Sequence, residues 1–151
     1  SLPKEMQVLH IAGAADFERV SEIAKGRDGY RVLGFCDQMP SAYAIADLVI
    51  ARSGASSLTE IAIAGLPSIL VPYPYAADDH QTRNAEVFES AGAAKLIQER
   101  DLDAGKLASL AISILQDLPT RERMAKASRT LAFPDAAARV CAAIEATLFP
   151  L

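Results

Sequence analysis

The sequence predicts a three-layer α/β fold, in which helices cover a parallel β-sheet. Short apolar runs rich in β-branched residues alternate with helical patterns over the first two thirds of the chain, and this alternation is typical of parallel βαβ units. Several runs, such as DLVIA at 47–51, are nearly continuous in apolar residues, as expected for strands covered on both faces. The last third has only helical patterns and is expected to form a helical tail.

The individual elements follow from apolar spacing and from turn residues. Strands are expected over residues 6–12, 30–35, 47–51, 68–72 and 94–97, and helices over residues 15–25, 39–46, 55–64, 79–91, 103–117, 120–131 and 135–148. The helix over 55–64 is expected to end at Gly65, because glycine is the usual residue there and Pro67 follows.

Length and composition favour one globular domain over residues 1–151. The chain is long enough for a sizeable core, and its 51% hydrophobic and 23% charged residues are ordinary for a soluble protein. A net charge of −4 argues against a dedicated nucleic-acid binder. No apolar run approaches the ~20 residues that cross a bilayer, and no leader pattern opens the chain. The first residue, Ser1, is not Met, so the chain could be a piece of a longer protein.

Cysteine usage points to a reducing compartment. The two cysteines, Cys36 and Cys141, lie far apart in the sequence, so neither a disulfide framework nor a thiolate metal site is expected. His80 has no companion at metal-ligand spacing, and no metal is expected there either.

Four loops leave the carboxyl ends of the expected strands, where open parallel sheets bind ligands. These loops are HIAGAAD (10–16), FCDQMP (35–40), ARSGASS (51–57) and PYPYAADDHQ (72–81). Small and polar residues suit each of them to close approach by a ligand. Any site in this domain is therefore expected at that edge.

The loop over 51–57 has the features of a phosphate site. Gly54 allows a tight turn and close approach to the backbone, and the following helix presents free N–H groups and the positive end of its dipole. Ser56 and Ser57 add hydroxyls, and Arg52 could add positive charge. Glu60 shares a helix face with Ser56 and could accept hydrogen bonds from both hydroxyls of a ribose.

A structural interpretation of the same residues stays open. Ser57 and Glu60 have the spacing of a capping box, which would stabilise the helix without any ligand. The packing face of this helix is expected to consist of Leu58, Ile61, Ala62 and Gly65.

The loop that ends at Gln81 offers a second set of polar groups. Asp78 or Asp79 is expected to cap the helix, with His80, Gln81 and Thr82 in its first turn. Gln81 could bond sugar hydroxyls at a cleft mouth. Alternatively, the aspartates only cap the helix, and His80 and Gln81 are solvated.

Phe35, Cys36 and Met39 could form the wall of a site for a planar base, although such residues are more often core. Cys36 has no basic neighbour that would make it a nucleophile. His10 and Gly13 are a weaker candidate for a ligand-binding site.

The stretch ARSGASSLTEIAIAGLPSILVPYPYAADDHQTRNAEVFESAGAA (residues 51–94) closely resembles the carboxyl-terminal half of the MurG family of peptidoglycan glycosyltransferases. The resemblance extends from about residue 7 to 147. It implies a GT-B architecture, in which two Rossmann-like domains enclose the active site and the carboxyl-terminal one holds the nucleotide sugar.

The resemblance also implies roles for individual residues. Cys36 matches the residue whose backbone meets the uracil, with Phe35 and Met39 beside it. The loop and helix start that bind the phosphates and ribose match Ala55, Ser56, Ser57, Leu58, Thr59 and Glu60, with Glu60 on the ribose hydroxyls. Arg52, Ser53 and Gly54, just before them, are also expected to bind the substrate. Gln81 matches the residue that holds the sugar hydroxyls, and His80 precedes it.

The family transfers N-acetylglucosamine from UDP-N-acetylglucosamine to lipid I, with inversion and without a cofactor, on the cytoplasmic face of the bacterial membrane. The sequence lacks the family's amino-terminal half, with its proposed base, acceptor site and main membrane contact, and also the first strand and Gly-Gly-Ser loop of the carboxyl-terminal half. Ile11 stands where the family pattern has Gln. The chain alone is therefore expected to be inactive.

Two other functions stay open. One is a non-catalytic donor-binding subunit that works with a partner chain. The other is a sugar-nucleotide hydrolase or epimerase of the same architecture. A nicotinamide enzyme is disfavoured, because no GxGxxG precedes the first helix.

Overall fold

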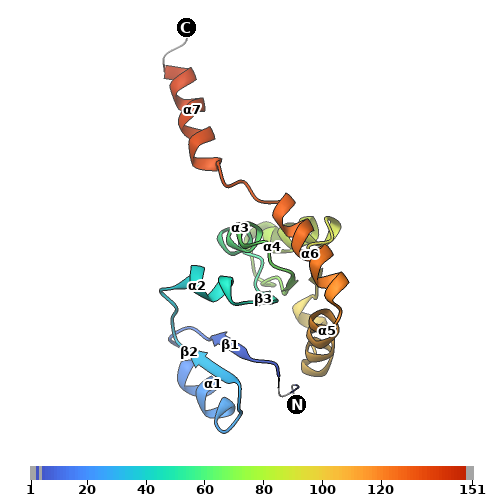
Figure 1. The fold of residues 1–151 in the computed structure, drawn as a ribbon. Helices are drawn as coiled ribbons and strands as arrows, with labels where there is room; N and C mark the ends of the chain where they lie inside the picture. The colour runs from blue at the N-terminus through green and yellow to red at the C-terminus, as the bar shows by residue number, and fades with distance from the viewer. Residues whose placement is uncertain (1–2, 4, 149–151) are drawn as a thin grey trace. The chain divides into compact units, whose positions relative to one another are not determined.

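The structure is a computed structural model that describes residues 3 and 5–148. It divides into two compact units, Ser1–Ala46 and Asp47–Leu151. Figure 1 shows the helices and strands of both units in chain order.

The first unit contains a pair of parallel strands and two helices. Its elements are β1 (Val8–Ile11), α1 (Phe17–Ala24), β2 (Tyr30–Leu33) and α2 (Met39–Ala44). β1 and β2 pair with Val8 opposite Tyr30 and Ile11 opposite Leu33, and α1 lies in contact with β2. The carboxyl ends of both strands therefore lie at one edge of this small sheet.

The second unit begins with a three-stranded parallel sheet in the order β3-β4-β5. Its first part comprises β3 (Val49–Ala51), α3 (Ala55–Ala64), β4 (Ser68–Leu70), a 3-10 turn over Ala77–Asp79, α4 (His80–Ser90) and β5 (Ala94–Leu96). Every residue of the central strand β4 is buried. The sheet thus exposes the carboxyl ends of β3 and β4 side by side, with Ala51 opposite Leu70.

The core of the second unit joins β4 to the helical tail. After a 3-10 turn over Glu99–Asp101, the chain forms α5 (Ala104–Gln116), α6 (Leu118–Thr130) and α7 (Ala136–Leu148). Ile69 of β4 is buried against residues of α5 and α6, namely Ala111, Ile114 and Met124. On α3, Leu58, Ile61 and Ala62 are buried, and α3 contacts α6. This packing joins α3 to the helical tail.

α3 ends where the sequence predicts. Gly65 has a φ of 66°, in the left-handed region, and its amide donates to the carbonyls of Ala62 and Ile61. The left-handed backbone therefore favours glycine there, and a Cβ at this position would also displace the side chain of Arg129 on α6.

α7 differs from the other helices of the second unit, because all of its residues are exposed. It includes the apolar residues Val140, Ile144 and Leu148. Within the described part of the chain, no helix combines the length and the apolar character needed to cross a membrane.

The predicted fold class is confirmed, because parallel strands alternate with helices and a helical tail follows. Two details of the prediction are wrong. The described strands form two separate sheets rather than one, and β1 and β3 alternate between half-buried and exposed residues, so they are not covered on both faces. The assignment of one domain to residues 1–151 stays a prediction, and it includes residues 1, 2, 4 and 149–151, which lie outside the described residues.

Candidate functional site

The start of α3 presents backbone amides that have no acceptor within the helix, at the carboxyl edge of the β3-β4-β5 sheet. Gly54 is the N-cap, with an extended backbone (φ −67°, ψ 145°) and no side-chain cap. The first intrahelical bond runs from the amide of Leu58 to the carbonyl of Gly54, at 3.0 Å. The amides of Ala55, Ser56 and Ser57 therefore have no acceptor within the helix, which is the arrangement that binds anions.

The capping box predicted for Ser57 and Glu60 does not form. Ser57 lies in the first helical turn, three residues after the N-cap Gly54, so its side chain cannot occupy the capping position. The reason is that the chain turns into the helix at the glycine, where the backbone leaves β3. The capping-box interpretation of Ser57 and Glu60 is therefore wrong.

The side chains of this turn differ in exposure. Ala55, Ser56, Thr59 and Glu60 are exposed, Ser57 is half-buried, and Leu58 is buried. The hydroxyl of Thr59 donates to the carbonyl of Ala55 at 2.9 Å. Ser56 and Glu60, four residues apart, lie on the same exposed face of α3.

Ser53 joins the β3–α3 loop to the start of α4. It is fully buried; its hydroxyl donates to the carbonyl of Gln81 at 2.8 Å, and its own carbonyl accepts from Nδ2 of Asn84 at 3.1 Å. The helix starts of α3 and α4 are thus held together. Sequence reasoning did not identify Asn84, although a polar residue on the same side of the helix as the buried Ala85 and Phe88 could have indicated it.

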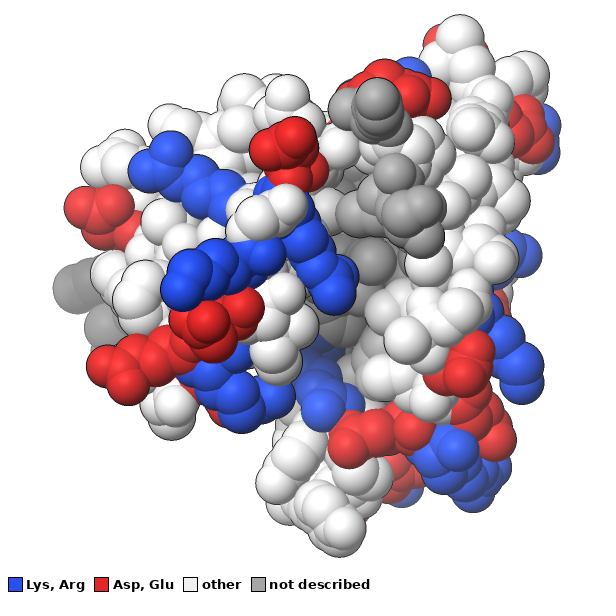
Figure 2. All heavy atoms as spheres, turned by 90° about the horizontal axis from the view of Figure 1, so that it is seen from below, with Lys and Arg blue, Asp and Glu red and all other residues white. Residues whose placement is uncertain are grey.

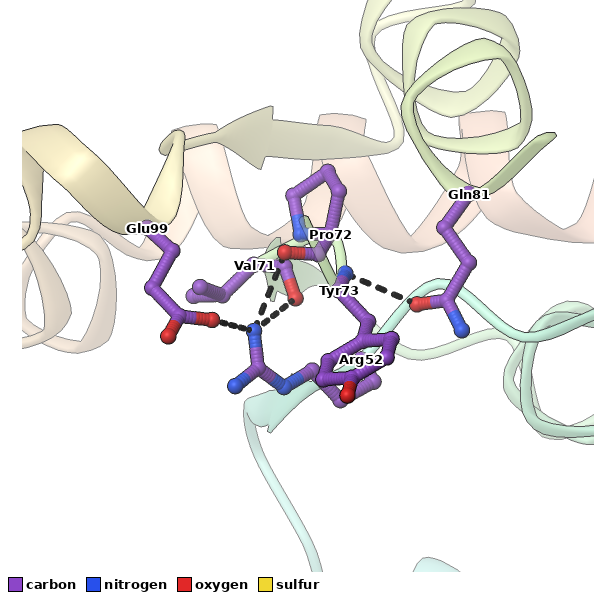
Figure 3. A network of polar contacts seen from close by, with 6 residues as sticks. All are labelled: Arg52, Val71, Pro72, Tyr73, Gln81 and Glu99. Atoms are coloured by element: carbon purple, nitrogen blue, oxygen red, sulfur yellow. Dashed lines mark hydrogen bonds and ion pairs between the residues drawn. The ribbon is translucent and has the colours of Figure 1, made fainter. Parts of the chain in front are cut away.

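Arg52 anchors the end of β4 (Figure 3). Its Nη1 donates to the carbonyls of Val71 at 3.3 Å and Pro72 at 3.0 Å and to Oε2 of Glu99 at 2.5 Å. The guanidinium carbon also lies 5.6 Å from the ring centre of Tyr73. The guanidinium is therefore fixed at the carboxyl edge of the sheet, within the loop over 51–57 that the sequence predicts to bind phosphate.

Gln81 lies in the first turn of α4, as predicted, and is half-buried. Its Oε1 accepts a hydrogen bond from the amide of Tyr73 at 3.0 Å. Among the described residues, no partner is recorded for its Nε2. The side-chain amide therefore uses its oxygen within the protein.

Asp79 occupies the N-cap of α4, but its carboxylate makes no bond to a backbone amide there. Instead, Oδ1 accepts from the hydroxyl of Thr82 at 2.6 Å. Asp78 and Asp79 both have positive φ, 51° and 52°, which is uncommon outside glycine. His80 is exposed, and its Nδ1 lies 2.8 Å from the carbonyl of Ala77.

The predicted base-binding residues lie in the first unit, after β2. Phe35 is 80% exposed, so the alternative that it is a core residue is wrong. Cys36 and Met39 are half-buried. Their convergence with the loops of the second unit stays a prediction. His10 contacts Tyr30 within the first unit, with Nδ1 2.8 Å from the hydroxyl.

Acidic and basic side chains are interspersed on the face drawn in Figure 2. Ion pairs join Arg19 to Asp16 at 2.8 Å and Lys25 to Glu22 at 3.4 Å. No cluster of three or more His, Cys, Asp or Glu residues suited to a metal ion occurs within residues 3 and 5–148.

The comparisons with known proteins agree on one family. Residues 2–140 match the family described as "Glycosyltransferase family 28 C-terminal domain". A UDP-N-acetylglucosamine--N-acetylmuramyl-(pentapeptide) pyrophosphoryl-undecaprenol N-acetylglucosamine transferase of Nitratidesulfovibrio vulgaris is 44% identical over 137 residues, which cover 89% of this chain and 38% of that protein. The transferase of the same name from Burkholderia ambifaria is 47% identical over 146 residues, covering 91% and 39%.

Solved structures show the same relationship. The crystal structure of Acinetobacter baumannii MurG superposes with a TM-score of 0.81 at 33% identity, over 94% of this chain and 45% of that one. A putative UDP-N-acetylglucosamine 2-epimerase from Listeria monocytogenes shares the fold, with a TM-score of 0.68 at 18% identity. This chain spans about two fifths of the length of the curated relatives it matches.

Proposed function

Because the chain belongs to the glycosyltransferase family 28 C-terminal domains, we propose that it binds the donor of a MurG-type transferase. The donor would be UDP-N-acetylglucosamine, and the reaction would convert lipid I to lipid II in peptidoglycan synthesis. The names of the relatives support this assignment. The observation that carries it is the uncapped start of α3 at the carboxyl edge of the sheet.

The diphosphate would lie on the first turn of α3. The three amides that lack helical acceptors point to this end, and the helix dipole adds partial positive charge. The N-cap residue is Gly54, which has no side chain to occupy the capping position, so an anion would displace no capping group from it. Arg52 adds a guanidinium nearby, which bonds to Pro72 and Glu99 hold in place, although the Glu99 carboxylate offsets much of its charge.

The remaining groups would recognise the nucleoside and the sugar. Glu60 would accept hydrogen bonds from the ribose hydroxyls, because it lies one turn along the exposed face of α3 from Ser56. Nε2 of Gln81 would donate to a hydroxyl of the hexosamine, with His80 beside it. The uracil would meet the backbone at Cys36, with Phe35 and Met39 around it.

The proposed reaction is an inverting displacement at C1 of the hexosamine. The acceptor hydroxyl oxygen forms a bond to C1 while the bond from C1 to the diphosphate oxygen breaks, and UDP leaves. The amides of α3 would stabilise the negative charge that develops on the diphosphate. A base from a part of the enzyme outside this sequence would take the hydroxyl proton.

The assignment of donor binding to this chain, and of the acceptor site and base to the rest of the enzyme, has two consequences. The isolated chain is not expected to turn over lipid I, because the acceptor site and the base are assigned to other parts of the enzyme. Its place would be the cytoplasmic side of the bacterial membrane, with membrane contact made mainly by the other half. Measurable transfer to lipid I by the 151-residue chain would contradict this assignment.

Isothermal titration calorimetry with UDP and UDP-N-acetylglucosamine tests the proposal. We expect both ligands to bind and the sugar nucleotide to stay intact during the titration. Failure of both to bind the folded chain would overturn the proposed function. Release of free sugar would instead support a hydrolase.

A further inference from the structure

Two tyrosines lie exposed on the turn that follows β4. Tyr75 is 83% exposed and Tyr73 is 44% exposed. Among the described residues, no hydrogen bond is recorded for the hydroxyl of Tyr75. Aromatic rings carry a large apolar area, and Tyr75 lies two residues after Tyr73, whose amide bonds to Gln81.

The turn holds Tyr75 in a defined place. The amide of Ala76 donates to the carbonyl of Tyr73 at 3.2 Å, which closes a four-residue turn with Pro74 at its second position. Proline fixes φ near the value that this position requires. The backbone that carries Tyr75 is therefore ordered before any ligand binds, and this lowers the entropic cost of binding.

Tyr73 supports Tyr75 from the protein side. The ring centres lie 5.7 Å apart and the ring planes are inclined at 72°, so the two rings form a corner rather than a flat platform. Tyr73 in turn lies against the guanidinium of Arg52, at 5.6 Å. Arg52 is itself bonded to Pro72 and Glu99, so it holds the ring of Tyr73 in place.

The corner is directly connected to the residue proposed to bind the sugar. The amide of Tyr73 donates to Oε1 of Gln81 (Figure 3). We propose that Tyr75, supported by Tyr73, receives the apolar face of the donor's hexopyranose ring. The axial C–H groups of such a ring match the π-face of an aromatic side chain, while Nε2 of Gln81 meets its hydroxyls. This proposal rests on the proposed function, because it names a further contact to the same donor.

The proposal distinguishes the sugar from the nucleotide. UDP has no hexose, so removal of the Tyr75 ring should leave UDP binding unchanged. We expect Tyr75→Ala to weaken UDP-N-acetylglucosamine binding about fivefold, the size of one aromatic contact. Tyr75→Phe keeps the ring and should bind the sugar nucleotide within about twofold of the wild type.

The test is a calorimetric titration of the wild-type chain and its Tyr75→Ala, Tyr75→Phe and Phe133→Ala variants with both ligands. Phe133 is a matched control, because it is 60% exposed but follows α6 rather than β4. A thermal melt confirms that each variant is folded. A loss confined to Tyr75→Ala and to the sugar nucleotide would support the proposal.

Other results would overturn it. Unchanged binding of UDP-N-acetylglucosamine to Tyr75→Ala would show that the ring does not contact the donor sugar, and an equal loss for UDP would show that it acts on the nucleotide. Both results presuppose a wild-type chain that binds the donor. They are therefore distinct from failure of the proposed function, in which the wild type binds neither ligand.

Discussion

Oε1 of Gln81 accepts a hydrogen bond from the backbone amide of Tyr73 at 3.0 Å. This bond joins the first turn of α4 to the turn that follows β4. It also orients the side-chain amide, because the oxygen is engaged and the nitrogen faces away from that partner. Gln81 thus has two separable tasks, one structural and one proposed for ligand binding.

Replacement of Gln81 should separate these tasks. Gln81→Leu should destabilise the chain by about 1 kcal/mol, because the amide of Tyr73 loses its acceptor, whereas Gln81→Glu keeps an acceptor and should stay near wild-type stability. Gln81→Leu also removes every polar group that could meet the sugar, so it should lower the ratio of UDP-N-acetylglucosamine to UDP affinity about tenfold. The carboxylate of Gln81→Glu can still accept from a sugar hydroxyl, so that variant serves as the stability control. Denaturant unfolding and calorimetry measure the two effects, and an unchanged ratio in Gln81→Leu would contradict the sugar contact.

Replacing Gly54 tests the anion site, because one substitution should raise stability and lower the affinity for UDP. Its Cβ position meets no atom within 4 Å, and its φ of −67° suits any residue, so Gly54→Asp should be accommodated. An aspartate N-cap would bond the free amides and raise the free energy of unfolding by about 0.5 kcal/mol. The same carboxylate would block and repel a diphosphate, so UDP should bind at least about tenfold more weakly.

Gly54→Ala is the matched control, because it adds a Cβ without an acceptor. It should bind UDP more tightly than Gly54→Asp does. A stabilised Gly54→Asp variant that binds UDP like the wild type would show that the diphosphate lies elsewhere.

Glu60 is proposed to hold the ribose hydroxyls. Glu60→Ala should weaken UDP binding by about 1.4 kcal/mol or more, which is a tenfold change, because charge-assisted hydrogen bonds are lost. The same variant should lose discrimination between UDP and 2′-deoxy-UDP. Calorimetry on a variant shown by its melting curve to be folded gives the answer, and equal discrimination in wild type and variant would count against the contact.

Asp117 provides a pH-dependent prediction outside the site. Its carboxylate caps α6 by accepting from the hydroxyl and the amide of Thr120, at 2.5 and 3.2 Å. Both bonds lower the pKa of Asp117 below its usual 3.8, and the bond from the Thr120 hydroxyl has the larger effect. The positive charge of Arg123 lowers the pKa further. Because the folded pKa is depressed, the stabilisation is present above the unfolded pKa and is lost as pH falls through the folded value.

Asp117→Ala should therefore be less stable than the wild type at neutral pH, and the difference should shrink as pH drops below about 4. Denaturant unfolding at several pH values measures it. A difference that stays constant across this range would show that the charged cap contributes nothing.

The sequence predicted the helices and strands well, because the residues that start, end and pattern each of them lie close together in the sequence. α3 was bounded correctly, since apolar spacing, Gly65 and Pro67 all act within a few residues. The capping box was wrong for a physical reason. Its pattern is also local, but the position where the helix starts depends on the end of β3, and the turn at Gly54 placed Ser57 inside the helix.

The side-chain network of the site could not be predicted in the same way. Arg52 bonds to Glu99, 47 positions away, and Ser53 bonds to Asn84 across 31 positions. Such contacts depend on which strands become neighbours, and residue spacing carries no information about that. The sequence placed Arg52 and Ser53 in the right loop but left open what each of them contacts.

The central claim is that the free amides at the start of α3 bind the diphosphate. It is tested most directly by NMR titration of the ¹⁵N-labelled chain with UDP. We expect the amide signals of Ala55, Ser56 and Ser57 to shift most within the second unit and to saturate with the calorimetric affinity. Saturating binding that leaves these three signals in place would contradict the account.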